Sequence, residues 1–170
     1  MKKSIFLLFG ILSTILLCAQ KNFKVPQLTS EQEKEVLFNH VMAYSVTGIS
    51  FAKTQGVSSE DYGRFIGKKF TEYWNPDAGF SMLVNQMMYI LAGMYPDNQI
   101  QIVEQNENSI TFQLKNVDLA FRNGPMFDVT YHDFLDCSYG IISELADFVH
   151  ADFSHKTTGD GWYVATFSKK

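Results

Sequence analysis

Residues 99–114 read QIQIVEQNENSITFQL, and this stretch decides the class of fold. Apolar and polar side chains alternate on both sides of the polar turn Asn106-Glu107-Asn108, which is the two-residue period of β-strands. Apolar residues before and after this stretch recur at helical spacing instead. The pattern therefore predicts a β-hairpin with one apolar face, set between helices, in an α+β protein.

Three helices are predicted before the hairpin, at residues 30–55, residues 58–74, and from Asp77 to the turn at residues 95–98. The first helix has apolar and small residues on one face at helical spacing: Leu37, Val41, Tyr44 and Gly48. The third helix carries a continuous apolar stripe: Phe80, Val84, Met87, Leu91 and Met94. In the second helix Gly63 and Gly67 lie four residues apart, and we expect another helix to come close there.

One helix and a second hairpin are predicted after residue 114. Thr130 and Asp133 form a capping pair at the start of the helix, which reaches Phe148. Strands are predicted at residues 149–156 and 162–168, and residues 116–127 are expected to be partly loop. We therefore expect a single α+β domain over residues 20–170, with three N-terminal helices, a β-hairpin, a helix and a C-terminal β-hairpin. Both hairpins are expected to form one antiparallel sheet packed by helices.

The first 19 residues have the pattern of a bacterial-type signal peptide. Two lysines precede an apolar stretch from Ile5 to Leu17, and Ala19 stands just before the polar part of the chain. The stretch is shorter than the ~20 residues that a transmembrane helix needs. We expect cleavage after Ala19 and export to the periplasm or the cell exterior. Lipoprotein anchoring through Cys18 is the less favoured alternative, because the residue before a lipidated cysteine is normally small and here is Leu17.

The charge balance excludes several classes of partner. The chain has 14 basic and 18 acidic side chains, and removing residues 1–19 takes two lysines, which leaves 12 basic and 18 acidic side chains and a formal charge of −6. An acidic chain without a basic cluster is poorly suited to nucleic acid or to an anionic membrane surface. The mature chain has no second hydrophobic segment and so no expected transmembrane helix. Its one cysteine, Cys137, leaves no intramolecular disulfide to form.

Cys137 is also the candidate for a catalytic nucleophile, with His132 or His150 as its base. Residues five apart on a helix lie about 140° apart around its axis, so His132 and Cys137 are not expected to pair directly. A cysteine among apolar residues is more often a small buried hydrophobe. A hydrolase that uses Cys137 is therefore kept as an alternative function.

The histidines do not have the spacing of metal ligands. On a strand, His150 and Asp152 would point to one face and His155 to the other, so we expect no metal site and no cofactor. The acidic residues of the last helix are typical of a solvated helical face: Asp133, Asp136, Glu144 and Asp147.

Residues 137–140 (CSYG), the apolar helix after them and residues 152–163 (DFSHKTTGDGWY) resemble the end of the 4-vinyl reductase type of small-molecule-binding domain. The closing part is also similar to the L-2-amino-thiazoline-4-carboxylic acid hydrolase-like family. The resemblance covers roughly residues 98–168 and implies helices and two hairpins around a mainly apolar cavity. In both families cysteines typically stand near the positions of His155 and Tyr163. Their absence from this chain argues against a cysteine-based metal site or cysteine chemistry at those positions.

Methionine and aromatic residues favour a binding function. Four of the seven methionines lie in the predicted third helix, and methionine often lines surfaces that adapt to apolar ligands. We expect an exported, non-enzymatic protein whose pocket binds a small apolar or amphipathic molecule. Its expected lining residues are Tyr44, Met87, Leu91, Phe112, Phe134 and Trp162. An interaction module that oligomerises through an apolar face is a further alternative.

Overall fold

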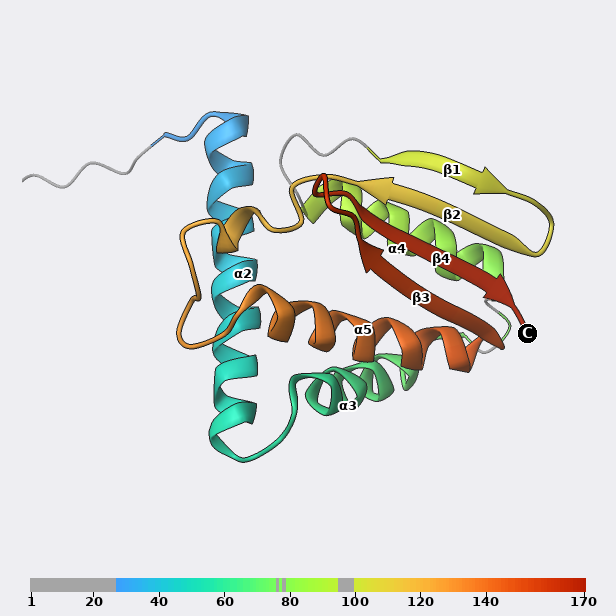
Figure 1. The fold of residues 1–170 in the computed structure, drawn as a ribbon, viewed down its shortest axis with the longest axis horizontal. Coiled ribbons are helices and arrows are strands. Elements are labelled where there is room, and N and C mark those ends of the chain that lie inside the picture. Colours follow the sequence, from blue (N-terminus) through green and yellow to red (C-terminus); the bar gives the residue numbers. More distant parts are fainter. Residues whose placement is uncertain (1–26, 76, 78, 95–99) are drawn as a thin grey trace, which may run out of the picture. The chain divides into compact units, whose positions relative to one another are not determined.

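The computed structural model describes residues 27–75, 77, 79–94 and 100–170 (Figure 1). The predicted signal peptide, Cys18 and the predicted turn at residues 95–98 lie outside these residues. The chain divides into two compact units, residues 1–31 and residues 32–170, and the fold and site described below belong to the second. Within the described residues, none of the helices combines the length and the apolar character that crossing a membrane requires.

The order of elements predicted from the sequence is confirmed, with bounds that agree within a few residues. The helices are α2 (Ser30–Thr54), α3 (Ser59–Thr71), α4 (Gly79–Met94) and α5 (Tyr131–Phe148). The strands are β1 (Gln101–Gln105), β2 (Ser109–Leu114), β3 (Ala151–Thr157) and β4 (Tyr163–Lys169). A short 3-10 helix, η2 (Leu119–Phe121), lies in the segment expected to be partly loop.

The strands form one antiparallel sheet in the order β1-β2-β4-β3, which confirms the predicted α+β fold. Every second side chain of β2 and β4 is buried, and together they make the covered face of the sheet: Ile110, Phe112, Leu114, Tyr163, Ala165 and Phe167. The rings of Phe112 and Phe167 stack across the two strands with 6.0 Å between their centroids. The helices pack against this face, and the candidate site lies over it.

The edge strand β1 departs from the prediction of one apolar face. All its residues are exposed, and Ile102 and Val103 keep 55% and 57% of their surface in solvent. The pairing of β1 with β2 shifts register between Ile102 and Glu104. Ile102 is paired with the buried Phe112 and therefore points to the same face of the sheet, but on this edge strand it stays mostly in solvent. Val103 lies at the register shift itself. The apolar residues of β1 therefore do not reach the core.

Helices α3 and α5 lie side by side and approach each other closely (Figure 1). A Cβ atom on Gly63 would overlap the carbonyl oxygen of Cys137, and a Cβ on Gly140 would overlap the backbone of α3. A Cβ on Gly67 would lie 2.8 Å from the carbonyl oxygen of Ile141, which is also too close. The prediction of a close helix contact at Gly63 and Gly67 is confirmed, and the partner helix is α5.

Helix α2 buries a different face from the one that the sequence pattern indicated. Its buried side chains are Phe38, Met42, Val46, Ile49 and Ala52. Leu37, Val41 and Tyr44, which share a face at helical spacing, are 65%, 45% and 78% exposed, so this stripe does not face the core. Both stripes have helical spacing, and periodicity alone does not say which of two apolar faces the rest of the chain covers.

A polar junction ties α2 and α3 to the start of α5. The Asp133 carboxylate accepts hydrogen bonds from the Thr130 amide at 2.9 Å and from the Thr130 hydroxyl at 2.7 Å, in a capping box that the sequence pattern predicts. Lys53 Nζ of α2 lies 3.0 Å from Asp133 Oδ2 and donates to the Asp128 carbonyl at 2.9 Å. The Ser59 hydroxyl of α3 donates to Asp133 Oδ1 at 3.2 Å. One carboxylate thus connects three helices.

Candidate ligand-binding cavity

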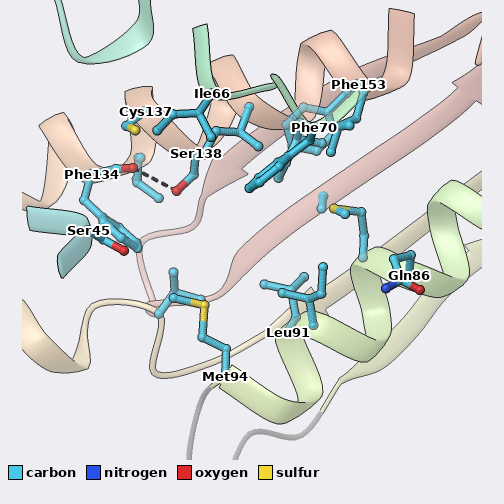
Figure 2. A pocket seen from close by; sticks show the side chains of 18 of the residues that line it. Ser45, Ile66, Phe70, Gln86, Leu91, Met94, Phe134, Cys137, Ser138 and Phe153 are labelled. Carbon is cyan, nitrogen blue, oxygen red and sulfur yellow. Dashed lines mark hydrogen bonds between the residues drawn. The ribbon is translucent and has the colours of Figure 1, made fainter. Parts of the chain in front are cut away.

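A cavity of about 440 Å³ lies between the covered face of the sheet and helices α3, α4 and α5, with α2 at one end. Figure 2 shows most of its lining side chains. Small-molecule sites in proteins typically enclose about 300–1,000 Å³ and are lined mainly by apolar side chains. This cavity has the size of such a site.

The spacing of residues along α4 and α5 determines which side chains form the walls of the cavity. Met87, Leu91 and Met94 follow one another four and three residues apart on α4, so their side chains share one face and form one wall. On α5 the same spacing brings Phe134 and Ser138 to the opposite side, followed by other apolar lining residues: Ile141, Ile142 and Leu145. Helix α4 makes few close contacts with β4 and with α5, and the space between these two walls is therefore not filled.

Helix α3 and the sheet complete the cavity. Tyr62, Ile66 and Phe70 lie four residues apart on α3 and point into it, while the glycines of the same helix face α5. The sheet contributes the floor: Phe112, Phe153, Tyr163, Ala165 and Phe167. Gly63 and Gly67, one in each of two successive turns, let α3 approach α5 closely and so bring its row of large apolar side chains near that helix.

The described residues that line the cavity include no Asp, Glu, Lys, Arg or His. The polar side chains among them include Ser45, Gln86 and Ser138. The Ser45 hydroxyl donates to the Val41 carbonyl of its own helix at 2.8 Å. The Ser138 hydroxyl donates to the Phe134 carbonyl at 2.9 Å (Figure 2). The site is thus uncharged and offers only a few polar anchors.

Four of the six residues predicted from the sequence line this cavity: Met87, Leu91, Phe112 and Phe134. The other two do not. Tyr44 is 78% exposed on the outer face of α2 and stacks with His40, with 6.4 Å between ring centroids. Trp162 lies just before β4, and Lys115 Nζ is 4.7 Å from the centroid of its ring.

Several lining residues escaped the sequence reasoning. Ile49 belongs to the buried stripe of α2 and Ser45 lies next to it, whereas the sequence pattern pointed to the stripe that contains Tyr44. Tyr62, Ile66 and Phe70 of α3 form a row with helical spacing, but none of the three is among the predicted lining residues. Counting apolar residues at every fourth position of α3 would have found this row.

Cys137 lines the cavity as a protonated thiol. It is 5% exposed, and burial raises the pKa of the thiol to about 11. At neutral pH only about one molecule in ten thousand would carry the thiolate. His132 has 85% of its side chain in solvent and lies 3.4 Å from Asp136, and His150 is exposed in the turn after α5. Neither proposed base has a hydrogen bond to Cys137 among the described contacts.

His155 is the histidine nearest to the site. It lies on β3 between lining residues, with its ring centroid 5.9 Å from that of Phe153 and 5.3 Å from that of Tyr163. Its Nδ1 is buried and has no hydrogen-bond partner in the described structure. Burial lowers the pKa of His155, a change that Asp136 opposes and His132 reinforces. His155 is therefore a neutral ring that supports the floor of the cavity.

The strand geometry expected for these histidines holds only in part. β3 begins at Ala151, and His150 lies before it in a left-handed conformation with φ +56°. Asp152 is exposed and His155 half-buried, on opposite faces of β3. No group of three His, Cys, Asp or Glu side chains suited to a metal ion occurs in the part of the chain that the structure describes.

The acidic side chains of α5 have partners at the surface. Glu144 lies 3.2 Å from Arg64 on α3, and Asp147 lies 2.6 Å from Lys170 at the chain end. Asp136 pairs with His132, and Asp133 belongs to the capping junction described above. None of the four lines the cavity.

No family model matches the chain, and no curated protein matches it. The resemblance of the C-terminal half to the 4-vinyl reductase type of domain therefore finds no support there. Among solved structures, the chain is similar to an Fe(II) unliganded H-NOX protein from K. algicida, with a TM-score of 0.38 and 13% sequence identity. The match covers 95% of this chain and 88% of the H-NOX chain. A point mutant of the same protein covers 95% of this chain and 86% of its own, with a TM-score of 0.37 and 12% identity. A likeness at this level assigns neither a family nor a function.

Proposed function

We propose that this chain is an exported protein that binds a small, mainly apolar molecule in the cavity between the sheet and helices α3, α4 and α5, without catalysing a reaction on it. The observation that carries the proposal is the cavity itself, about 440 Å³ in volume and lined by apolar side chains from helices and strands. Its size and lining match those of small-molecule sites.

The non-enzymatic part of the proposal rests on the chemistry of the lining. General acid–base catalysis needs a group whose pKa lies near the working pH. The lining residues that the structure describes include no carboxylate, amine or imidazole, and the Cys137 thiol has its pKa raised to about 11 by burial. A hydrolase that uses Cys137 is therefore disfavoured.

The export part rests on the sequence of residues 1–19. Native mass spectrometry of the full chain expressed in an exporting bacterium tests both parts together. We expect a mature species that begins at Gln20 and carries one small adduct, which is lost on denaturation. An uncleaved chain would contradict export, and a chain that takes up no apolar ligand would contradict the binding function.

A pair of tryptophan substitutions shows where the adduct binds. Leu91 lines the cavity, and the neighbouring Ala92 is exposed on the same helix and does not line it. We expect Leu91→Trp to fill the cavity and to abolish the adduct, and Ala92→Trp to retain it. If both variants retain the adduct, the ligand binds elsewhere and the cavity is not the site.

Self-association through α2 is a second candidate function, because this helix leaves an apolar stripe in solvent. Leu37, Tyr44 and Phe51, each at least 65% exposed, lie seven residues apart, with Val41 between the first two. This is the spacing of a coiled-coil seam, which two copies of one helix can share. Light scattering over a range of concentrations tests it: a dimer that Tyr44→Glu dissociates, and that Asn39→Glu at an exposed position away from the stripe does not, would favour this function.

A further inference from the structure

We infer that the ligand of this cavity is an uncharged molecule with a hydrocarbon body and a hydroxyl group, held with the hydroxyl between Ser45 of α2 and Ser138 of α5. This inference rests on the proposed binding function and specifies the class of ligand. It follows from which polar atoms line the cavity and from the hydrogen bonds that those atoms already make.

Charged ligands do not fit the lining. The described lining residues include no ionised side chain, so a carboxylate or an ammonium group inside the cavity would have no counter-ion among them. Burying an unpaired charge costs far more free energy than burying a neutral polar group. The part of the ligand that enters the cavity is therefore neutral.

The polar atoms lie mainly at one end. Figure 2 shows Ser45, Phe134 and Ser138 together at the end of the cavity nearest α2, whereas Gln86 projects from α4 on the other side. Leu91 and Met94 form an apolar wall away from the serines. A ligand with one polar end and a hydrocarbon body matches this division.

Each serine offers an acceptor and no free donor. The Ser45 proton is directed to the Val41 carbonyl and the Ser138 proton to the Phe134 carbonyl, and a carbonyl oxygen can only accept. Such a bond to a residue four positions earlier is common for serine in helices. The two serine oxygens therefore keep lone pairs that can accept, and because both serines line the cavity, we infer that they recognise a ligand group that donates a proton.

Because of Tyr62, a ligand hydroxyl group fits this end of the cavity better than an ether or an ester. Tyr62 also lines the cavity, and its phenol oxygen lies against Gly48, one turn beyond Ser45 on α2. A phenol can donate as well as accept. A ligand hydroxyl can donate to a serine and accept from Tyr62, whereas an ether or ester can only accept and leaves both serine oxygens without a donor.

Three twelve-carbon ligands test the inference: dodecanol, its methyl ether and dodecanoate. Their affinities are measured at pH 7 by displacement of a neutral apolar fluorescent dye from the mature chain. We expect dodecanol to bind about 3- to 10-fold more tightly than the ether, the value of one net hydrogen bond. Dodecanoate should bind least tightly, because its carboxylate is ionised.

Alanine variants connect this preference to the two serines. Ser45→Ala and Ser138→Ala should each lower the ratio of the dodecanol affinity to the ether affinity and leave the ether affinity unchanged. Ser81→Ala is the matched control on α4, because Ser81 is exposed and does not line the cavity. Equal affinities for alcohol and ether in the wild type, or a ratio that neither serine variant changes, would overturn the inference alone. If none of the three ligands displaces the dye, the proposed binding function itself fails.

Discussion

The backbone of Gly63 on α3 lies directly against the carbonyl oxygen of Cys137 on α5, and the space between them holds no side chain. This contact sets the distance between two helices that both line the cavity, since Tyr62 and Ile66 lie beside Gly63 and Ser138 follows Cys137. The geometry of the candidate site therefore depends on a position where no group larger than hydrogen is accommodated.

Gly63→Ala should destabilise the protein strongly. A Cβ at this position would overlap backbone atoms, which cannot rotate away as a flexible side chain can. We expect a loss of about 2–3 kcal/mol in the free energy of unfolding, as for other overpacked interiors. Denaturant unfolding of the mature chain measures it.

Gly93→Ala is the matched control for this prediction. Gly93 lies within α4, and a Cβ there would meet no heavy atom within 4 Å. Alanine should therefore be neutral, or stabilise the helix by up to about 1 kcal/mol. Equal losses in the two variants would show that glycine removal matters only through local backbone effects and not through the α3–α5 contact.

Asp133→Asn should loosen the junction of three helices. Burial alone would raise the pKa of the Asp133 carboxyl, but hydrogen bonds from the Thr130 amide and hydroxyl and from Lys53 outweigh it and hold the pKa well below its usual range. Asparagine retains the shape and loses the charge that pairs with Lys53. We expect a loss of about 1–3 kcal/mol at pH 7, measured by denaturant unfolding.

The stability lost in Asp133→Asn should depend on pH, and the pKa of the Asp133 carboxyl gives the direction of this dependence. Because its pKa is lower in the folded chain than in the unfolded chain, its contribution is present above the ordinary carboxyl pKa of about 4 and disappears as the pH falls below it. The stabilities of wild type and Asp133→Asn should therefore converge in acid. A difference that stays constant from pH 7 down to pH 2 would contradict the ionic role of Asp133.

The sequence was sufficient to predict the order of elements because each element carries a strong local signal. Thr130 and Asp133 form the predicted capping box, and the spacing of Gly63 and Gly67 marks the close helix contact. On α4, the predicted stripe that includes Met87 and Leu91 reaches the cavity. Local periodicity and capping determine these features, and both are visible in one sequence.

The sequence was not sufficient where two local patterns compete or where tertiary packing decides. α2 is apolar on two faces, so Tyr44 was placed at the pocket although the stripe containing Met42 and Ile49 is the buried one. Ser45 is a lining residue only because of that choice of face. β1 reads as a strand with an apolar face, but it is an edge strand of the sheet and Ile102 stays 55% exposed there. These outcomes depend on neighbours far away in the sequence.

The Cys137 thiol should react slowly and report on the cavity. Burial raises its pKa to about 11, so its reaction with a small neutral maleimide should be far slower at pH 7 than that of a free cysteine and should accelerate toward pH 11. Because Cys137 lines the cavity, a bound ligand should slow the reaction further. Mass spectrometry of the labelled protein over time measures the rate. A fast reaction at pH 7 would contradict the burial of the thiol and revive a nucleophilic role.

His155 should make the fold sensitive to mild acid. Its ring is packed among Tyr139, Phe153 and Tyr163, and burial lowers its pKa, so the folded chain resists a proton that the unfolded chain accepts. Stability is then fully present above the ordinary histidine pKa of about 6.5 and falls as the pH drops below it, with a slope of at most about 1.4 kcal/mol per pH unit for one proton.

His155→Phe should remove this dependence, because a phenyl ring keeps the packing and does not titrate. His150→Asn is the matched control, since His150 is exposed with φ +56°, a conformation that asparagine tolerates. Unfolding free energies between pH 7 and pH 5 should decline for wild type and His150→Asn and stay level for His155→Phe. If the unfolding free energy of His155→Phe declines as steeply as that of wild type, the acid sensitivity arises at another group, and the His155 ring beside Phe153 contributes packing alone.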